Sequence, residues 1–303
     1  MPSAVDTSRA LTWLVTGCST GIGKEIVLSA LSRGHRVIAT GRSASRLSDL
    51  KAAGAEVHEF DPNAPPDKVT AFANSIVEHY GGVDVLVNNA GYMQTGTIEE
   101  TTPEQLVQQY HTNVFAPIHL TKAFLPSMRA RRSGTVFMIG SIAAYQFLPA
   151  AGIYDSSKAA LKGLTHSLAA EVKHLGISVC HIEPGLFRTA VFESFSSKQP
   201  SSHEAKGHEQ EEEGLIKDYA AVREQTIGFF QSTHENQPGD PARLGKLLVD
   251  LVTGEGQVGA MGFPEALSVG SDCVAIMQKL LKNDLQRVEA WKAISESTDF
   301  PKA

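Results

Sequence analysis

Short apolar segments alternate with longer amphipathic segments along this chain. A segment of about four to eight residues that is apolar at nearly every position is typical of a strand buried on both faces, and the amphipathic segments between such strands are typical of helices that pack on a sheet. The predicted strands are Thr12–Thr16, Arg36–Thr40, Glu56–Phe60, Val83–Asn88, Thr135–Ile139, Ser178–Ile182 and Val258–Phe263. The pattern predicts an α/β fold with a doubly wound parallel sheet of about seven strands and helices on both faces.

Helices are predicted between these strands, and several of them are followed by a glycine that suits a left-handed C-terminal cap. The predicted helices are Ile22–Arg33, a segment around Leu47, Asp67–Tyr80, Pro103–Arg131, Ile153–Leu175, Tyr219–Phe230, a segment after Pro241, and Ala266–Ala293. Because a chain of this length can bury one large α/β core, we expect a single domain over residues 1–303.

A polar segment rich in Ser, Glu and His, Glu193–Glu213, follows the sixth strand. Ligands of open α/β sheets bind outside the carboxyl ends of the strands, so we expect residues at about 190–238 to form a lid over the substrate, either ordered or disordered. A C-terminal helical extension at about 264–296 is expected to close the substrate side.

Composition excludes several classes of function. The chain has 27 Lys+Arg and 33 Asp+Glu, a net charge of −6, and no dense basic run, so nucleic acid is not an expected partner. Cys18, Cys180 and Cys273 lie far apart, and no Cys/His cluster has ligand spacing, so no metal site is predicted. The start of the chain lacks a signal-peptide pattern, and no apolar run reaches the roughly 18 residues of a membrane span, which predicts a cytoplasmic protein.

A glycine turn follows the first predicted strand, with the pattern Thr-Gly-x-x-x-Gly-x-Gly over Thr16–Gly23. Glycines let a pyrophosphate approach the backbone, and the N-H groups at the start of the following helix point at the anion. The turn predicts a dinucleotide site. Its candidate residues are Gly17, Ser19, Thr20, Gly21, Ile22 and Gly23.

Two further motifs accompany the turn: Asn88-Asn89-Ala90-Gly91 after the fourth strand, and a Tyr-x-x-x-Lys element at Tyr154 and Lys158. With these motifs, roughly Leu11 to Thr189 resembles the short-chain dehydrogenase/reductase family. The resemblance implies a Rossmann-type fold, a nicotinamide cofactor and interconversion of a carbonyl with an alcohol. It also implies cofactor contacts from Asn89, Ala90, Gly91, Tyr154, Lys158, Pro184, Gly185 and Thr189.

The end of the second strand bears on which nicotinamide cofactor is used. An acidic residue there would accept hydrogen bonds from the adenosine ribose and repel a 2′-phosphate, but this chain has Gly41 and Arg42. A guanidinium can pair with the phosphate, so NADP(H) is predicted in preference to NAD. An arginine that serves only solubility is the alternative. By resemblance Asp61 binds near the adenine; otherwise it is an ordinary turn aspartate.

The predicted catalytic residues lie on the fifth and sixth strand-helix units and on the long fourth helix. Tyr154 and Lys158 are four positions apart on one helix face, so the ammonium group can lower the pKa of the phenol, which would act as general acid or base. Ser141, just past the fifth strand, would hydrogen-bond the substrate oxygen. By resemblance, Lys158 binds the nicotinamide ribose and Asn113 holds a water that links Lys158 to solvent.

Asp155 departs from the small residue that commonly follows this tyrosine in the family. A carboxylate beside Tyr154 could raise the pKa of the phenol if it pointed inward. Adjacent helix positions face different ways, so we expect Asp155 to be solvated.

Residues around the predicted site are mainly apolar and aromatic, although half of them could equally belong to the core. They predict a hydrophobic carbonyl or alcohol substrate, such as a steroid, retinoid, polyketide or terpenoid. The candidates are Tyr92, Met93, Gln94, Ile142, Tyr145, Gln146, Phe147, Leu148, Leu186, Phe187, Val191, Phe192 and Phe195.

Three functions fit these residues. The first is an NADP(H)-dependent oxidoreductase. The second is a non-redox isomerase, cyclase or lyase that uses the same pocket, and the third is a cofactor-sensing regulatory protein, which would need no proton relay. By resemblance the chain forms a homodimer or homotetramer.

Overall fold

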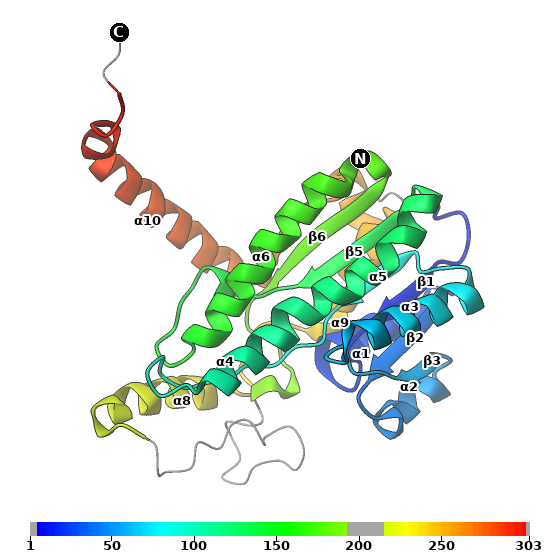
Figure 1. The fold of residues 1–303 in the computed structure, drawn as a ribbon, viewed down its shortest axis with the longest axis horizontal. Helices are drawn as coiled ribbons and strands as arrows, with labels where there is room; N and C mark the ends of the chain where they lie inside the picture. Colours follow the sequence, from blue (N-terminus) through cyan, green and yellow to red (C-terminus); the bar gives the residue numbers. More distant parts are fainter. Residues whose placement is uncertain (1–4, 193–214, 301–303) are drawn as a thin grey trace.

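The sheet has seven parallel strands in the order β3-β2-β1-β4-β5-β6-β7 (Figure 1). The computed structural model describes residues 5–192 and 215–300. The predicted Rossmann-type, doubly wound sheet is confirmed. The strands are β1 Thr12–Val15, β2 Arg36–Gly41, β3 Glu56–Glu59, β4 Val85–Asn88, β5 Gly134–Ile139, β6 Ile177–Pro184 and β7 Ala266–Val269.

Helices cover both faces of the sheet (Figure 1). The described helices are α1 Gly21–Ser32, α2 Ser48–Ala52, α3 Pro66–Tyr80, α4 Pro103–Tyr110, α5 Ala116–Arg131, α6 Gly152–Val172, α8 Ala220–Thr233, α9 Pro241–Thr253 and, projecting from the body, α10 Ser271–Glu296. Short 3₁₀ turns flank them, at Ala44–Leu47, Ile142–Ala144, Lys173–Leu175, Ala190–Phe192, Lys217–Tyr219 and Gly256–Ala260.

The apolar strands are buried because alternate side chains enter two different cores. In β1, Trp13 and Val15 pack in one core with residues of α1 and α9, whereas Leu14 packs in the other with residues of α3, α5 and α6. All three side chains have no exposed surface. This alternation on the two faces explains why nearly every position of the strand is apolar.

The predicted long helix Pro103–Arg131 is interrupted. A π-helical turn, η2 at His111–Phe115, separates α4 from α5. Such turns add one residue to the helix and are frequent at functional sites. Asn113 lies in this turn, so the interruption determines where its side chain points.

The predicted seventh strand at Val258–Phe263 is wrong. Its first part forms a 3₁₀ turn, Gly256–Ala260, and Gly262 has a φ of +76°, which an extended strand does not accommodate. The seventh strand is Ala266–Val269, which pairs with β6, although the sequence pattern predicts the start of the C-terminal helix at these residues.

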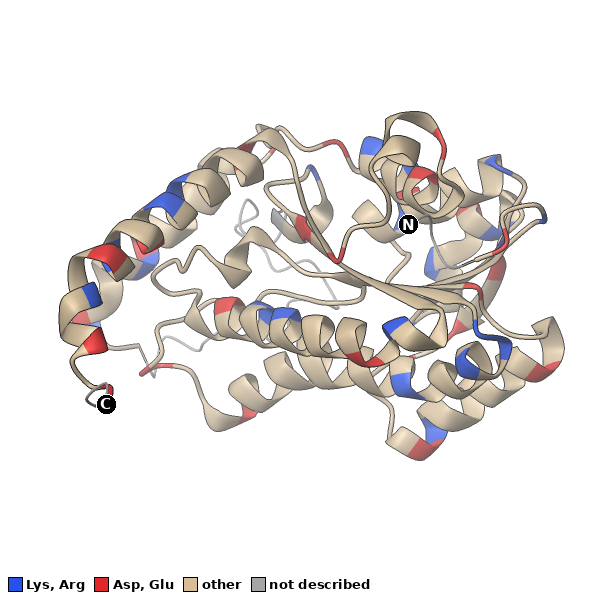
Figure 2. Cartoon of the chain, turned by 90° about the horizontal axis from the view of Figure 1, so that it is seen from above, with Lys and Arg blue, Asp and Glu red and all other residues tan. Residues whose placement is uncertain are grey.

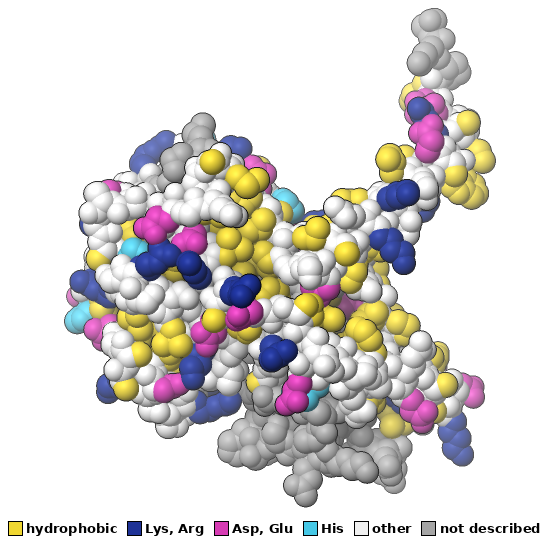
Figure 3. All heavy atoms as spheres, turned by 180° about the vertical axis from the view of Figure 1, so that it is seen from behind, with side chains coloured by type: hydrophobic (Ala, Val, Ile, Leu, Met, Phe, Trp, Pro, Cys, Tyr) yellow, Lys and Arg dark blue, Asp and Glu magenta, His cyan; other side chains and the backbone are white. Residues whose placement is uncertain are grey.

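The helix α10 does not close the substrate side as predicted. It leads away from the body of the molecule (Figure 1), and the space-filling view shows apolar side chains along it (Figure 3). The structure describes every residue of α10, and Cys273 is its one buried residue. The exposed apolar side chains include Leu281, Leu285, Val288, Trp291 and Ile294.

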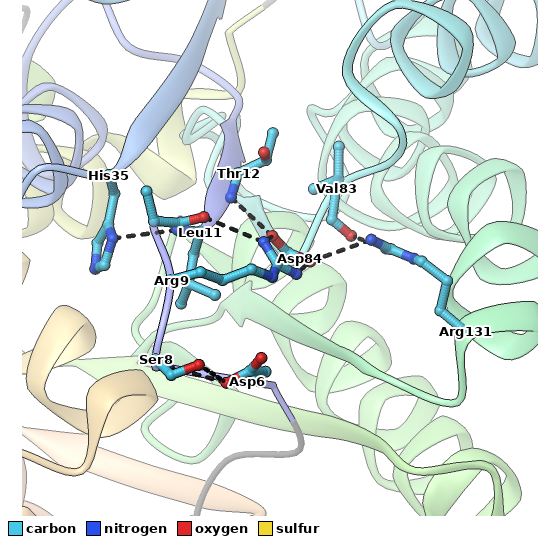
Figure 4. A network of polar contacts seen from close by, with 10 residues as sticks. Asp6, Ser8, Arg9, Leu11, Thr12, His35, Val83, Asp84 and Arg131 are labelled. Atoms are coloured by element: carbon cyan, nitrogen blue, oxygen red, sulfur yellow. Dashed lines mark hydrogen bonds and ion pairs between the residues drawn. The ribbon is translucent and has the colours of Figure 1, made fainter.

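An ion-pair network stabilises the edge of the sheet opposite the carboxyl ends of the strands (Figure 4). Asp84, just before β4, accepts hydrogen bonds from both guanidinium nitrogens of Arg9, at 2.8 and 2.9 Å, and from the backbone N-H of Thr12 at 2.9 Å. Arg131 lies 3.1 Å from the same carboxylate. The network joins the N-terminal segment to β1, β4 and α5.

Along the described chain, positions of Lys and Arg are interspersed with positions of Asp and Glu (Figure 2). Among the described helices, none combines the length and the apolar character that a membrane crossing requires.

Candidate active site

The site lies where the winding of the sheet reverses. β1 and β4 are neighbours, but the chain proceeds from β1 to β2 and β3 on one side and from β4 to β5, β6 and β7 on the other. Because the connections diverge, a crevice opens outside the carboxyl ends of β1 and β4. The glycine turn follows β1 and the Asn88–Gly91 motif follows β4, so two predicted motifs meet at this crevice.

Hydrogen bonds join these two motifs. The Thr16 hydroxyl accepts from the backbone N-H groups of Asn89 and Ala90, each at 3.0 Å. The Asn89 side-chain amide in return donates to the carbonyls of Thr16 at 2.9 Å and Gly17 at 3.1 Å. In this structure the Asn89 amide therefore holds the glycine turn in place, and Thr16, which we had not assigned a role, does the same from the other side.

The turn requires glycine at several positions. Gly17 and Gly21 have φ values of +69° and +59°, and a Cβ atom on Gly23 would lie 2.4 Å from the Asn89 amide nitrogen. A Cβ on Gly21 would lie 3.0 Å from the Thr189 side chain. The turn is therefore tightly packed, and Thr189, from the segment after β6, lies against it.

The start of α1 suits an anion. The structure describes the whole of α1, and its first turn carries no acidic side chain; Thr20, at the N-cap, makes no side-chain capping bond. The first N-H groups of a helix need partners and lie at the positive end of its dipole. Ser19 and Ile22 are half-buried in the turn, and Thr20 is exposed. These features fit the phosphates of a dinucleotide.

The residues predicted to select the cofactor lie beside the turn, after β2 and β3. Arg42 is exposed, and a Cβ on Gly41 would lie 3.3 Å from Leu47, so the glycine also has a packing role. Asp61 is exposed, and its carboxylate accepts from the Asn63 N-H at 2.9 Å. Asp61 therefore caps a turn in this structure.

The segment after β6 is fixed by the first turn of α10. Pro184 is buried at the end of β6, and a Cβ on Gly185 would lie 2.4 Å from a carboxylate oxygen of Asp272. The Leu186 N-H donates to the other oxygen at 2.6 Å. Glycine at this position is needed for contact with Asp272, a reason that the sequence did not reveal.

Tyr154, Lys158 and Ser141 come together as predicted. The Lys158 ammonium nitrogen lies 5.8 Å from the centre of the Tyr154 ring, on the same face of α6. It donates to the Ile139 carbonyl at the end of β5 at 2.9 Å. Ser141, two residues further on, interacts with the Tyr154 hydroxyl and acts to lower its pKa. The end of β5 thus positions all three groups.

The pKa values differ from the predicted pattern. Burial raises the pKa of Tyr154 to about 12; the hydrogen bond with Ser141 opposes this rise, and the charge of Asp155 adds to it. Burial also lowers the pKa of Lys158 to about 8, so this group is still mostly protonated at neutral pH. In the chain alone, Lys158 does not bring the phenol toward neutrality, because desolvation of the phenol dominates.

Asn113 is buried, and its side-chain amide both accepts a hydrogen bond from the backbone of Tyr92 and donates one to it. Its oxygen accepts from the Tyr92 N-H at 3.1 Å, and its nitrogen donates to the Tyr92 carbonyl at 3.0 Å and to Ser157 at 3.2 Å. A Cβ on Gly91 would lie 3.1 Å from the Asn113 oxygen and 3.7 Å from the Lys158 nitrogen. Asn113 therefore contacts the site through Tyr92, in the segment that follows β4.

Asp155 is buried, contrary to the expectation that it would be solvated. The loop before α6 folds back over the first turn of the helix, and the Leu148 N-H donates to the Asp155 carboxylate at 2.7 Å. Burial raises the pKa of Asp155 to about 7, and the bond from Leu148 only partly offsets this. The helix position alone did not reveal the loop that covers it.

An apolar cluster surrounds Tyr154. Met93 and Phe230 are buried, and Leu148, Leu186 and Tyr154 pack against them. Phe230, on α8, is a site residue that we missed: the apolar end of a predicted helix was the only signal, and it did not show where that helix would lie.

Other predicted pocket residues point elsewhere. Tyr145 donates to the buried carboxylate of Glu183, Phe187 belongs to the core shared with α1 and α9, and Phe147 and Val191 are exposed. The Phe192 side chain, Phe195 and the polar segment Glu193–Glu213 lie outside the described residues.

Comparison with known proteins identifies the class. The profile of the short-chain dehydrogenase family matches residues 12–200, which include the glycine turn, the catalytic candidates and the segment after β6. The chain belongs to this family, and the resemblance seen in the sequence is confirmed.

Individual relatives agree with this assignment. An oxidoreductase of Botryotinia fuckeliana is 29% identical over 287 residues, which cover 93% of this chain and 97% of the relative. The crystal structure of a short-chain dehydrogenase from Streptomyces avermitilis is 34% identical, with a TM-score of 0.81, and covers 96% of this chain and 99% of that chain. A metagenomic short-chain oxidoreductase in complex with NADP is 26% identical, with a TM-score of 0.63, over 88% of this chain and 98% of that chain.

Proposed function

We propose that this protein is an NADP(H)-dependent oxidoreductase that interconverts a carbonyl and a secondary alcohol on a hydrophobic substrate. The observation that carries the proposal is the convergence of Tyr154, Lys158 and Ser141 beside the glycine turn at the reversal of the sheet. A dinucleotide site alone would suit many enzymes, but a phenol held between a hydroxyl and an ammonium group suits proton transfer to or from an oxygen.

The cofactor would lie across the crevice. The glycine turn and the first turn of α1 would hold its phosphates, Arg42 its 2′-phosphate, and Lys158 its nicotinamide ribose. When bound, the nicotinamide supplies the hydride in reduction and accepts it in oxidation. Gly185 and Thr189 would lie against the nicotinamide end, and Asn89, Ala90 and Gly91 would also contact the cofactor. Asp61 would lie near the adenine.

The chain's own residues would handle the proton and the orientation of the substrate. Ser141 would hydrogen-bond the substrate oxygen and Tyr154 would donate a proton to it in reduction, or remove one in oxidation. A positive charge on Lys158 favours the phenolate and opposes the desolvation that raises the Tyr154 pKa in the chain alone. Asn113 would hold a water that links Lys158 to solvent.

The apolar cluster around Tyr154 supports a hydrophobic substrate, such as a steroid, retinoid, polyketide or terpenoid. We further propose that the protein acts in the cytoplasm and forms a homodimer or homotetramer. Light scattering of the purified protein would test the oligomeric state.

The direct test is to follow NADPH and NADH absorbance with a panel of apolar ketones. We expect loss of NADPH absorbance and conversion of the ketone to the alcohol in equal amounts. Conversion of a substrate without consumption of cofactor would instead support an isomerase, cyclase or lyase on the same scaffold.

A further inference from the structure

A buried ion pair fastens α8 to the segment that follows β4. The Glu100 carboxylate has no exposed surface, and the Arg223 side chain, on α8, is 16% exposed and contacts it directly. The Thr97 hydroxyl donates to Glu100 at 2.6 Å, and the Ile216 N-H donates to it at 2.8 Å. Arg223 also donates to the Ile216 carbonyl at 3.1 Å.

The Glu100 carboxylate is held in its charged form. Burial acts to raise its pKa, but the hydrogen bonds from Thr97, Ile216 and Arg223, with the charge of Arg223, outweigh burial and lower the pKa. Removing one partner of a buried pair leaves a charge without compensation, so such pairs are sensitive to substitution. The position of α8 therefore depends on this contact.

A second bond ties α8 to the other side of the site. The Thr226 hydroxyl donates to the Pro149 carbonyl at 2.8 Å, in the loop that carries Leu148. Arg223, Thr226 and Phe230 are spaced by three and four residues, so they lie along one face of α8. That face points at the site, since Phe230 is 3% exposed and packs with Met93 beside Tyr154.

We propose that the Glu100–Arg223 ion pair is a positioning device that holds Phe230 as a wall of the substrate pocket, so that α8 sets the size of apolar ketone that the enzyme accepts. The inference rests on the proposed function for its substrate class. Phe230 is the specificity-determining residue, and Glu100 and Arg223 act through it.

The first experiment measures the ion pair without turnover. Hydrogen exchange of the α8 backbone amides is compared in the wild type, Arg223→Ala, Glu100→Gln and the double variant. We expect each single variant to raise exchange about tenfold, and the double variant to add little, because both remove one interaction. Arg287→Ala breaks an exposed pair with Asp284 on α10 and is the matched control. Unchanged exchange in Arg223→Ala would overturn the positioning role.

The second experiment measures selectivity as the ratio of kcat/KM for decalone to that for cyclohexanone. Phe230→Ala should raise this ratio about tenfold by removing the wall, and Arg223→Ala should move it in the same direction. Arg223→Lys, which keeps the charge, should restore part of the difference, and NADPH affinity should stay within about twofold in each variant. Equal ratios in the wild type, Phe230→Ala and Arg223→Ala would refute the proposal.

Failure of the proposed function gives a different result. If the wild type oxidises NADPH with neither ketone, the assigned reaction is wrong for these substrates, while hydrogen exchange still decides whether the ion pair positions α8. Binding of the apolar dye anilinonaphthalenesulfonate then tests the wall directly: tighter binding to Phe230→Ala than to the wild type supports it, and equal binding contradicts it.

Discussion

The buried carboxylate of Asp155 accepts a hydrogen bond from the Leu148 N-H at 2.7 Å. Asp155 directly follows Tyr154 in the chain. One side chain thus holds the loop before α6 and places a titratable group beside the proposed acid-base residue. Because burial raises the pKa of Asp155 to about 7, its charge changes within the range in which the enzyme would work.

Asp155→Asn should shift the pH profile of the reaction. The negative charge of Asp155 contributes to the raised pKa of Tyr154, and asparagine removes the charge while it can still accept from Leu148. The pKa assigned to Tyr154 in the profile of kcat/KM should fall by about 0.5 to 1 unit. Asp155→Ala also loses the acceptor and serves to separate loop position from charge. An identical profile in Asp155→Asn would show that this charge does not reach the phenol.

The Asp155 carboxyl should also make the free energy of unfolding depend on pH. Its pKa is raised from 3.8 to about 7 in the folded chain, so the folded state binds the proton more tightly, and this contribution to stability is present below pH 4 and lost as the pH rises through 7. Compared with Asp155→Asn, the wild type should lose up to about 4 kcal/mol between these limits. Urea unfolding of the wild type and Asp155→Asn at a series of pH values measures this loss. A difference in free energy of unfolding that stays constant with pH would contradict the raised pKa.

Tyr154→Phe should abolish turnover with NADPH affinity within a few-fold of the wild type, since the phenol handles the proton and contributes little to cofactor binding. Lys158→Ala should weaken both, because Lys158 is proposed to bind the ribose and to favour the phenolate. Cofactor affinity is read from NADPH fluorescence and turnover from absorbance. Normal turnover by Tyr154→Phe would remove the proposed mechanism.

Arg42→Asp should shift cofactor preference from NADP to NAD. The carboxylate would repel the 2′-phosphate and accept hydrogen bonds from the ribose hydroxyls, as the exposed position after β2 allows. The measurement is the ratio of kcat/KM for NADPH to that for NADH, expected to fall at least about tenfold. Arg129→Asp, on α5, is the matched control for the change in net charge. If the two variants give the same ratio, Arg42 does not recognise the phosphate.

Asp84→Asn should lower the free energy of unfolding by about 2 kcal/mol without changing cofactor affinity, because Asp84 bonds to Arg9 and Thr12 at the edge of the sheet away from the site. Burial acts to raise the pKa of Asp84, but the bonds and charges of its partners outweigh it and hold the pKa below 3.8. The stabilisation is therefore present above that pH and lost as the pH falls through the lowered folded-state pKa.

The control for this prediction is Asp284→Asn, whose partner Arg287 is 68% exposed, as is Asp284 itself. Exposed pairs contribute little, so a change within about 0.5 kcal/mol is expected. Equal losses in urea unfolding of the two variants would contradict the role of the buried network.

The sequence by itself determined the first six strands, the glycine turn and the pairing of Tyr154 with Lys158. These features are local: a strand buried on both faces requires apolar residues in succession, a tight turn requires glycine, and residues four apart share a helix face. The seventh strand is an exception: a 3₁₀ turn occupies Gly256–Ala260, Gly262 has a positive φ, and the strand is Ala266–Val269.

Tertiary structure alone decided the burial of Asp155, the contact of Glu100 with Arg223 and the place of Phe230 beside Tyr154. In each case the deciding partner is brought by another segment: a loop that folds back over α6 for Asp155, or the helix α8, distant along the chain, for Glu100 and Tyr154. Periodicity records which side of an element is apolar, but the environment of a polar group depends on which segment packs against that side.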